Sequence, residues 1–222
     1  MTTPPIPLVV SAKQAKHVLT LGATQSGEYW SIPPGVDPFP FYQWIRGGPV
    51  NIRARHYWIA RTPVACESCA RDTKVTGFIL PPGHEVISDE DDPPEPVDPV
   101  NRVEPSSDEW VKQPHFALLS HIHFLLPTVF EPLYQQFEWL QPRVVLKNNL
   151  VRYINICQFC QNEVPDDYIF DEPGCGFAVT TAAESRRIEL TRVMQPFMGT
   201  VNVWTEELPW LEYRLGTRMA AL

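Results

Sequence analysis

The sequence of 222 residues predicts an α+β fold, in which a small αβ module over residues 1–46 precedes a larger, mostly antiparallel β-domain over residues 50–222. Three observations predict this arrangement. Short apolar runs alternate with turn signals before Gly47-Gly48, the glycine pair offers a boundary, and strand-like runs flank two Cys-x-x-Cys motifs beyond it. With 44% hydrophobic residues, a chain of this length can bury a core.

The N-terminal module is expected to contain two strands and two short helices. Ser11 is a candidate N-cap for the first helix, and Gly22 is a candidate stop. The sequence Pro33-Pro34-Gly35 turns the chain after the second strand, and Asp37 caps the second helix. The expected elements are a strand at 7–10, a helix at 12–20, a strand at 28–32 and a helix at 37–45.

The larger domain is expected to consist mainly of strands. Alternation of apolar and polar residues, or short apolar runs, predicts strands at 51–61, 75–80, 117–126, 151–156, 168–170 and 201–204. A further element, of no assigned type, is expected at 188–194. One short helix is expected over 132–140, because Pro132 suits a first turn and Pro142 ends the pattern.

Four cysteines form two identical motifs, Cys66-x-x-Cys69 and Cys157-x-x-Cys160. Each such turn, or knuckle, presents two thiolates, and two knuckles supply the four ligands of a closed, structural Zn²⁺ site. The alternatives are thiols without a metal and a redox couple, which would be expected to open a helix in a βαβ unit. Here each motif follows a strand-like run and precedes another apolar run, as in the halves of a zinc ribbon.

The two knuckles are far apart in the chain. The sequence places 87 residues between Cys69 and Cys157, where zinc ribbons have roughly 15–20. Because the entropy of closing a loop grows only logarithmically with its length, a zinc-ribbon-like fold with a long insertion is acceptable. Cys175 has no matching partner, and we expect it to be a small buried or free thiol.

The acidic residues are concentrated in a proline-rich segment at 85–109. That segment holds ten acids and one base, a net charge of −9, which leaves +1 for the rest of a chain whose total is −8. Such a composition predicts a solvated loop. Alternatively, it is an acidic arm that binds a basic protein partner. The candidate partner-binding residues are Asp89, Glu90, Asp91 and Asp92.

Basic and aromatic residues alternate along the expected strand at 51–61, and they are candidates for binding nucleic acid: Arg53, Arg55, Tyr57 and Arg61. Guanidinium groups bind phosphate, and aromatic rings stack on bases. The alternative is that the arginines pair with the acidic segment of the same chain. The chain also lacks the strongly basic balance that is typical of nucleic-acid-binding domains.

His121 and His123 lie two residues apart, so a strand would place both on one face. They could hold a second metal ion or serve in acid–base chemistry, which makes a metalloenzyme the third hypothesis. With apolar neighbours on both sides, partly buried, hydrogen-bonded histidines are the favoured interpretation. The sequence contains no G-x-S-x-G, P-loop, G-x-G-x-x-G or S-x-x-K motif, and we expect no enzyme.

The N-terminal residues also resemble a known bacterial module of unknown function. The resemblance rests on Lys16 to Ala23 (KHVLTLGA), on Tyr29 to Phe39 (YWSIPPGVDPF) and on Trp44. Similar modules occur in primase-like and plasmid-conjugation proteins, and ahead of paired Cys-x-x-Cys segments in uncharacterised bacterial proteins. The chain departs from the pattern at Thr24, near the position where the module has an aromatic residue. The resemblance implies a bacterial cytoplasmic protein and brings no catalytic residues.

These observations together predict a non-catalytic binding protein with a structural zinc site. An inhibitor or immunity-type protein fits best, with a basic toxin or nuclease as its partner. The alternative is a nucleic-acid-associated accessory protein of the plasmid or conjugation type. No apolar run approaches the roughly 20 residues that span a bilayer, and no secretory signal is seen, so a cytoplasmic location without membrane contact is expected.

Overall fold

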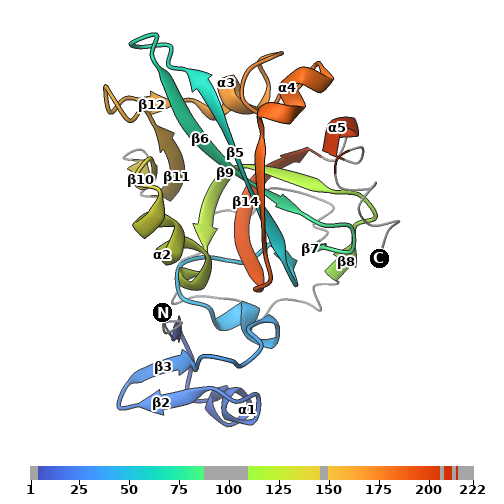
Figure 1. The fold of residues 1–222 in the computed structure, drawn as a ribbon. Coiled ribbons are helices and arrows are strands. Elements are labelled where there is room, and N and C mark those ends of the chain that lie inside the picture. The colour runs from blue at the N-terminus through green and yellow to red at the C-terminus, as the bar shows by residue number, and fades with distance from the viewer. Residues whose placement is uncertain (1–4, 88–109, 146–149, 206–207, 212–213, 215–222) are drawn as a thin grey trace.

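The structure is a computed structural model, and it describes residues 5–87, 110–145, 150–205, 208–211 and 214. It confirms the α+β class. The strands form three sheets in which every pairing is antiparallel, and short helices cover parts of them (Figure 1).

The N-terminal sheet has the order β1-β3-β2. Its strands are β1 (Ile6–Leu8), β2 (Thr24–Ser26) and β3 (Tyr29–Ile32), with helix α1 (Ala15–Thr20) between the first two and the 3-10 helix η1 (Phe39–Trp44) after the third. The expected elements are therefore present, with shorter helices, and β2 is an addition. Figure 1 shows this blue sheet below the rest of the molecule.

The large sheet has eight strands in the order β13-β5-β6-β9-β14-β4-β7-β8. The bounds are β4 (Ile52–Ala54), β5 (Tyr57–Ala65), β6 (Asp72–Leu80), β7 (Glu85–Ile87), β8 (Trp110–Lys112), β9 (Ala117–Leu125), β13 (Glu189–Val193) and β14 (Phe197–Thr205). A third sheet, β10-β11-β12, holds β10 (Leu140–Val145), β11 (Leu150–Ile156) and β12 (Glu163–Val164). The remaining helices are α2 (Pro127–Gln136), α3 (Asp166–Phe170), α4 (Ala182–Arg187) and α5 (Pro209–Leu211).

Three of the sequence-based expectations are wrong in detail. The strand expected at 51–61 is broken at Arg55-His56 into β4 and β5, which have no neighbouring strand in common. The run 168–170 belongs to helix α3, because Pro165 precedes it and two acids in its first turn favour a helix start. Helix α2 begins at Pro127, so Pro132 lies inside the helix and not in its first turn.

Two hydrophobic clusters hold the elements together. The larger one is continuous from Ile32 and Phe41 of the N-terminal module to Leu125 and Phe197 of the large sheet. Gly47 lies at this junction with φ +124°, and a Cβ there would come within 2.5 Å of the ring of Phe124. The backbone can therefore approach that ring closely only with glycine at this position.

The second cluster packs β5 and β6 against β11, β12 and the helices that follow them, and it includes Val64, Val75, Ile169 and Phe177. Phe177 rests over β6 where Gly77 leaves room, since a Cβ at Gly77 would lie 2.9 Å from the Phe177 ring. This cluster surrounds two of the four cysteines, Cys66 and Cys157.

A buried amide, that of Asn155 in β11, links the third sheet to the large sheet. Its Oδ1 accepts from the backbone N–H of Thr76 at 2.8 Å, and its Nδ2 donates to the carbonyl of Thr76 at 3.0 Å. The side chain thus makes with β6 the two bonds that a neighbouring strand would make. Asn155 is 3% exposed, so water cannot substitute for either bond.

Replacing Asn155 with alanine should leave the N–H and C=O of Thr76 buried without partners. We expect Asn155→Ala to lower the free energy of unfolding by about 2–4 kcal/mol, measured by urea denaturation. Asn202→Ala, at an exposed position of β14, is the matched control and should change it by less than about 0.5 kcal/mol. Equal effects of the two substitutions would contradict the assigned role of Asn155.

Candidate metal centre

Two tight turns with the same backbone design present the four cysteines. The first knuckle, Cys66–Cys69, connects β5 to β6, and the second, Cys157–Cys160, connects β11 to β12. In each, the residue four positions after the first cysteine donates its N–H to that cysteine's carbonyl: Ala70 to Cys66 at 2.7 Å, and Gln161 to Cys157 at 3.0 Å. Both donors have positive φ, +56° and +62°, so the two turns close in the same way.

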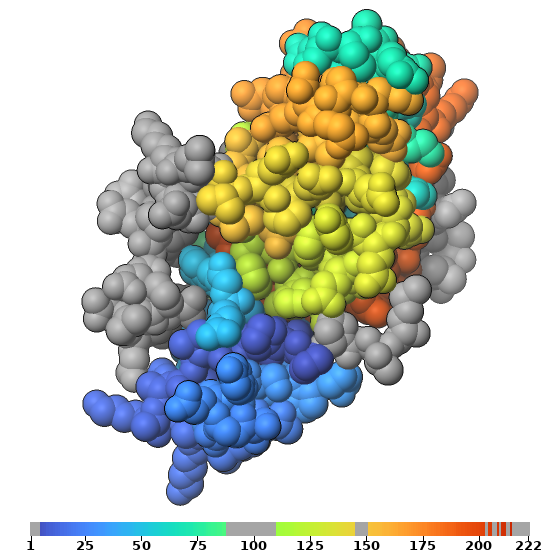
Figure 2. All heavy atoms as spheres, turned by 90° about the vertical axis from the view of Figure 1, so that its left-hand side faces the viewer, coloured from blue at the N-terminus to red at the C-terminus, as the bar shows by residue number. Residues whose placement is uncertain are grey.

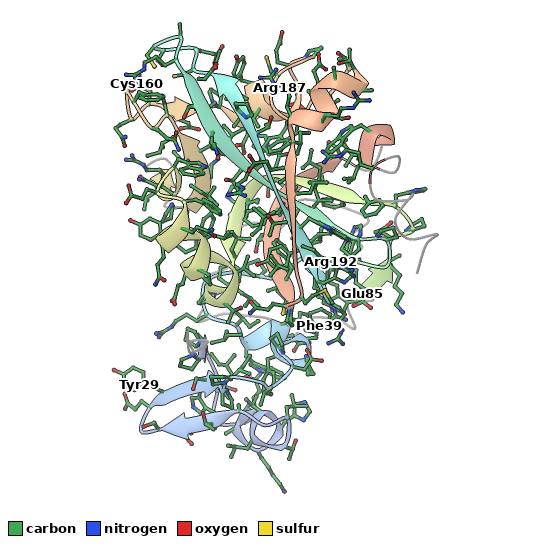
Figure 3. The ribbon with its side chains drawn as sticks, viewed as in Figure 1. Tyr29, Phe39, Glu85, Cys160, Arg187 and Arg192 are labelled. Atoms are coloured by element: carbon green, nitrogen blue, oxygen red, sulfur yellow. The ribbon has the colours of Figure 1, made fainter. Side chains whose placement is uncertain are left out.

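The four thiol sulfurs converge at one end of the molecule, where Figure 3 labels Cys160. All four lie within 4.8 Å of one another. The Sγ atoms of Cys66 and Cys160 are 3.7 Å apart, and those of Cys69 and Cys157 are 3.8 Å apart. These separations are far longer than a disulfide bond of about 2.05 Å. The four residues predicted from the two motifs therefore form one cluster that could hold a metal ion.

Contacts from β5 and β6 hold the second knuckle against the first. The backbone N–H of Gln158 donates to the hydroxyl of Thr73 at 3.1 Å. The hydroxyl of Tyr168 in α3 donates to the carbonyl of Ala65 at 3.0 Å, just before Cys66. Together with Asn155, these bonds link two distant parts of the chain beside the cysteines.

The environment of the thiols favours ionisation of one of them. Burial raises the pKa of Cys157, but the backbone N–H groups of Cys160 and Phe159 and the thiols of Cys160 and Cys66 lower it to about 6. At Cys160 the N–H of Asn162 lowers the pKa, while burial and the other three thiols raise it to about 12. Four thiols this close together cannot all become thiolates without a compensating cation.

Cys175 lies outside the cluster. It follows α3 in a loop, where it hydrogen bonds with the side chain of Tyr168. That hydrogen bond, followed by burial, raises the pKa of Tyr168 to about 12.

His121 and His123 lie on β9, and they have different partners. The imidazole Nε2 of His121 is 3.5 Å from Oδ1 of Asp167, whereas Nδ1 of His123 is 3.2 Å from the carbonyl of Val151. His121 also has φ +51°, close to a register shift between β9 and β14. Among the described residues, the four cysteines are the only group of three or more potential ligands with the geometry for a metal ion.

An ion cluster around Asp166 was missed in the sequence. This carboxylate is 5% exposed and accepts from the backbone N–H of His121 at 2.9 Å, with a guanidinium nitrogen of Arg152 at 3.6 Å. Burial raises the pKa of Asp166, although these neighbours oppose the shift. The signal in the sequence was a pair of acids directly after Pro165, where a helix starts. The cluster joins α3 to β9 and β11.

The four residues predicted to bind nucleic acid differ in burial and in their partners. Tyr57 is buried in the core. Each arginine has a carboxylate partner: Arg53 with Glu85 at 2.6 Å, Arg55 with Asp37 at 2.6 Å, and Arg61 with Glu189 at 3.1 Å. The guanidinium of Arg53 also covers the ring of Trp110 at 3.9 Å. These side chains therefore do not form one free basic surface.

The acidic segment lies largely outside the described residues, and Asp89, Glu90, Asp91 and Asp92 all fall there. Its first acid, Glu85, lies in β7 and pairs with Arg53. The strands on its two sides, β7 and β8, are antiparallel neighbours at the edge of the large sheet, near Glu85 in Figure 3.

Comparisons of the chain with protein-family models, with curated proteins and with solved structures gave no match. No helix in the described part of the chain is long and apolar enough to cross a membrane.

Removing one cysteine of the cluster should remove both the metal and much of the fold around it. We expect Cys157→Ser to lose the metal that the cluster would hold and to lower the midpoint of thermal unfolding, because only three cysteine ligands would remain for the metal. Native mass spectrometry counts the metal, and circular dichroism follows unfolding. Cys175→Ser is the control and should keep both properties; a metal content unchanged in Cys157→Ser would contradict the assignment.

His123 should contribute to the pH dependence of stability. Burial lowers its pKa below the ordinary value, although the carbonyl of Val151 opposes this shift. Below about pH 6.5 the unfolded chain therefore binds more protons at this site, and the free energy of unfolding falls as the pH falls. We expect His123→Gln to reduce that slope in urea unfolding across this range.

His56 should keep part of the slope in the variant, because burial and then Arg192 lower its pKa as well. Thiolates also take up protons when a metal leaves, so the informative quantity is the difference between the wild-type and variant slopes. Identical slopes would show that His123 does not contribute.

Proposed function

We propose that the four cysteines bind one structural Zn²⁺. A tetrahedral zinc with Zn–S bonds of about 2.3 Å separates its sulfurs by about 3.8 Å. The separations of 3.7 and 3.8 Å between two pairs of thiols support this ion. Four protein thiolates complete the coordination and leave no position for water or substrate, so the zinc would supply folding energy and not chemistry.

We propose further that the protein is a non-catalytic binding protein of the bacterial cytoplasm, of the inhibitor or immunity type. The observation that carries this proposal is the concentration of negative charge in the 85–109 segment. Both ends of the segment are attached to neighbouring strands, β7 and β8. Arg53 fastens this edge, since it pairs with Glu85 and stacks on Trp110.

A chain segment tethered in this way can present a row of carboxylates to a basic surface. The partner would be a basic protein, such as a toxin or nuclease, whose phosphate-binding cleft accepts Asp89, Glu90, Asp91 and Asp92. Complementary charges accelerate the encounter, and the effect weakens as salt increases. The rival function, binding of nucleic acid by the arginine strand, has less support because Arg53 and Arg61 are paired and Tyr57 is buried.

Neutralising the acidic arm should abolish binding of the basic partner. In the variant, asparagine replaces Asp89, Asp91 and Asp92, and glutamine replaces Glu90. We expect the wild type to retain proteins of high isoelectric point at low salt and to release them at high salt, and we expect the variant not to retain them. Affinity purification from a bacterial extract, with quantitative mass spectrometry at two salt concentrations, provides the measurement.

The matched control carries the same change of charge at four exposed acids elsewhere, Glu28, Glu131, Asp171 and Glu172. It should retain the same proteins as the wild type. If the arm variant and the wild type retain the same set, the arm is not the binding surface. Retention of nucleic acid by both, with no basic protein, would favour the rival function.

A further inference from the structure

Half of the glutamines in the chain line one polar pocket beside the second knuckle. The pocket has a volume of about 370 Å³. The sequence contains ten glutamines, and five of them line it: Gln135, Gln136, Gln141, Gln158 and Gln161. They come from the end of α2, from β10 and from the second knuckle. Figure 2 shows this face, where the yellow residues of α2 and β10 meet the orange residues of the second knuckle.

Two of these amides are held in place by their own turns. Gln141 donates its Nε2 to the carbonyl of Glu138 at 3.0 Å, and Gln161 donates its Nε2 to the carbonyl of Gln158 at 3.3 Å. Each bond uses one N–H and leaves the second N–H and the amide oxygen available. The pocket therefore offers hydrogen-bond donors and acceptors together, at positions that are partly fixed in advance.

Two of the lining residues, Trp139 and Ile156, are apolar, and a backbone bond of 2.7 Å from Ile156 to Trp139 joins them. The ring of Trp139 is held by its Nε1, which donates to the hydroxyl of Thr76 at 3.1 Å. Among the described residues that line the pocket, Glu138 is the one charged residue. This lining, with no lysine or arginine among the described residues, does not suit a phosphate or a carboxylate.

These properties match a ligand that is neutral, rich in hydroxyls and apolar on one face. Each hydroxyl both donates and accepts, as each glutamine amide does, and the carboxylate of Glu138 can accept from hydroxyls as well. The volume is at the small end of the range of about 300–1,000 Å³ for ligand pockets. We propose that this pocket binds a neutral saccharide of one or two rings, with Trp139 against the face of the sugar.

The site is distinct from the surface assigned to the basic partner. Gln158 belongs to the second knuckle and Gln161 directly follows it, so these two lining residues lie beside the cysteine cluster. The acidic arm is attached to β7 and β8 at the opposite side of the view in Figure 1. The described strands that flank the arm therefore supply no residue to the pocket.

The proposal is tested by saturation-transfer NMR of the full chain with three neutral disaccharides: maltose, cellobiose and N,N′-diacetylchitobiose. We expect at least one to receive saturation from the protein. Its affinity should fall about tenfold in Gln141→Ala, since the amide bonded to the sugar is removed. Gln136→Ala is a second variant, at an exposed position at the end of α2, and it should weaken binding similarly.

Gln25→Ala in β2 is the matched control, because it removes the same amide from a distant exposed strand, and it should leave the affinity unchanged. Glucose 6-phosphate and adenosine are added as comparison ligands, and neither should bind as well as the disaccharide. The proposal is overturned if no disaccharide receives saturation, if Gln141→Ala and Gln136→Ala bind as tightly as Gln25→Ala, or if adenosine binds in preference.

Discussion

The structure depends on the meeting of two knuckles that lie far apart in the sequence. The strand pair β5–β6 carries one knuckle and the β11–β12 pair carries the other, so the cysteines converge only when two sheets have packed. The residues between the knuckles are an integral part of the fold, because they form the central strands β6 and β9 as well as β11. A metal bound there would stabilise the whole arrangement, since the unfolded chain cannot bring the four thiols together.

A buried asparagine, Asn155, and a half-buried one, Asn51, replace strand pairing at two places where the pairing of strands ends. Asn155 bonds to both backbone groups of Thr76 in β6. Asn51 does the same for Val201 in β14, with bonds of 2.7 and 3.0 Å, beside the register shift of that strand. Each amide satisfies one N–H and one C=O in the interior, which hydrophobic contacts cannot do. Hydrophobic packing and these polar bonds thus both hold together the sheets that carry the two knuckles.

The cysteine cluster was predictable because the Cys-x-x-Cys spacing encodes a local turn, and the same turn occurs twice. The arginine strand was predicted less well, since alternation continues across Arg55-His56 although the chain turns there and Tyr57 enters the core. The glutamine pocket gave no signal: Gln135, Gln141 and Gln158 come from three elements, and only the packing of α2 and β10 against the second knuckle brings them together. A repeated local motif can be found in the sequence even when its copies lie far apart, whereas single glutamines from three elements form no motif.

The order of the strands separates the two proposed binding surfaces. The acidic segment joins β7 and β8, the last two strands at one edge of the large sheet, and the glutamine pocket lies on the small sheet that Asn155 fastens to β6. Between them are β9, β14 and β4, whose side chains form a close-packed core. The packed core separates β7 and β8, which flank the acidic segment, from the pocket, and the described residues of these two strands are not among those that line it. A metal bound by the four cysteines would therefore lie beside the pocket, because Gln158 is part of the second knuckle, and would act on β7 and β8 only through the stability of the fold.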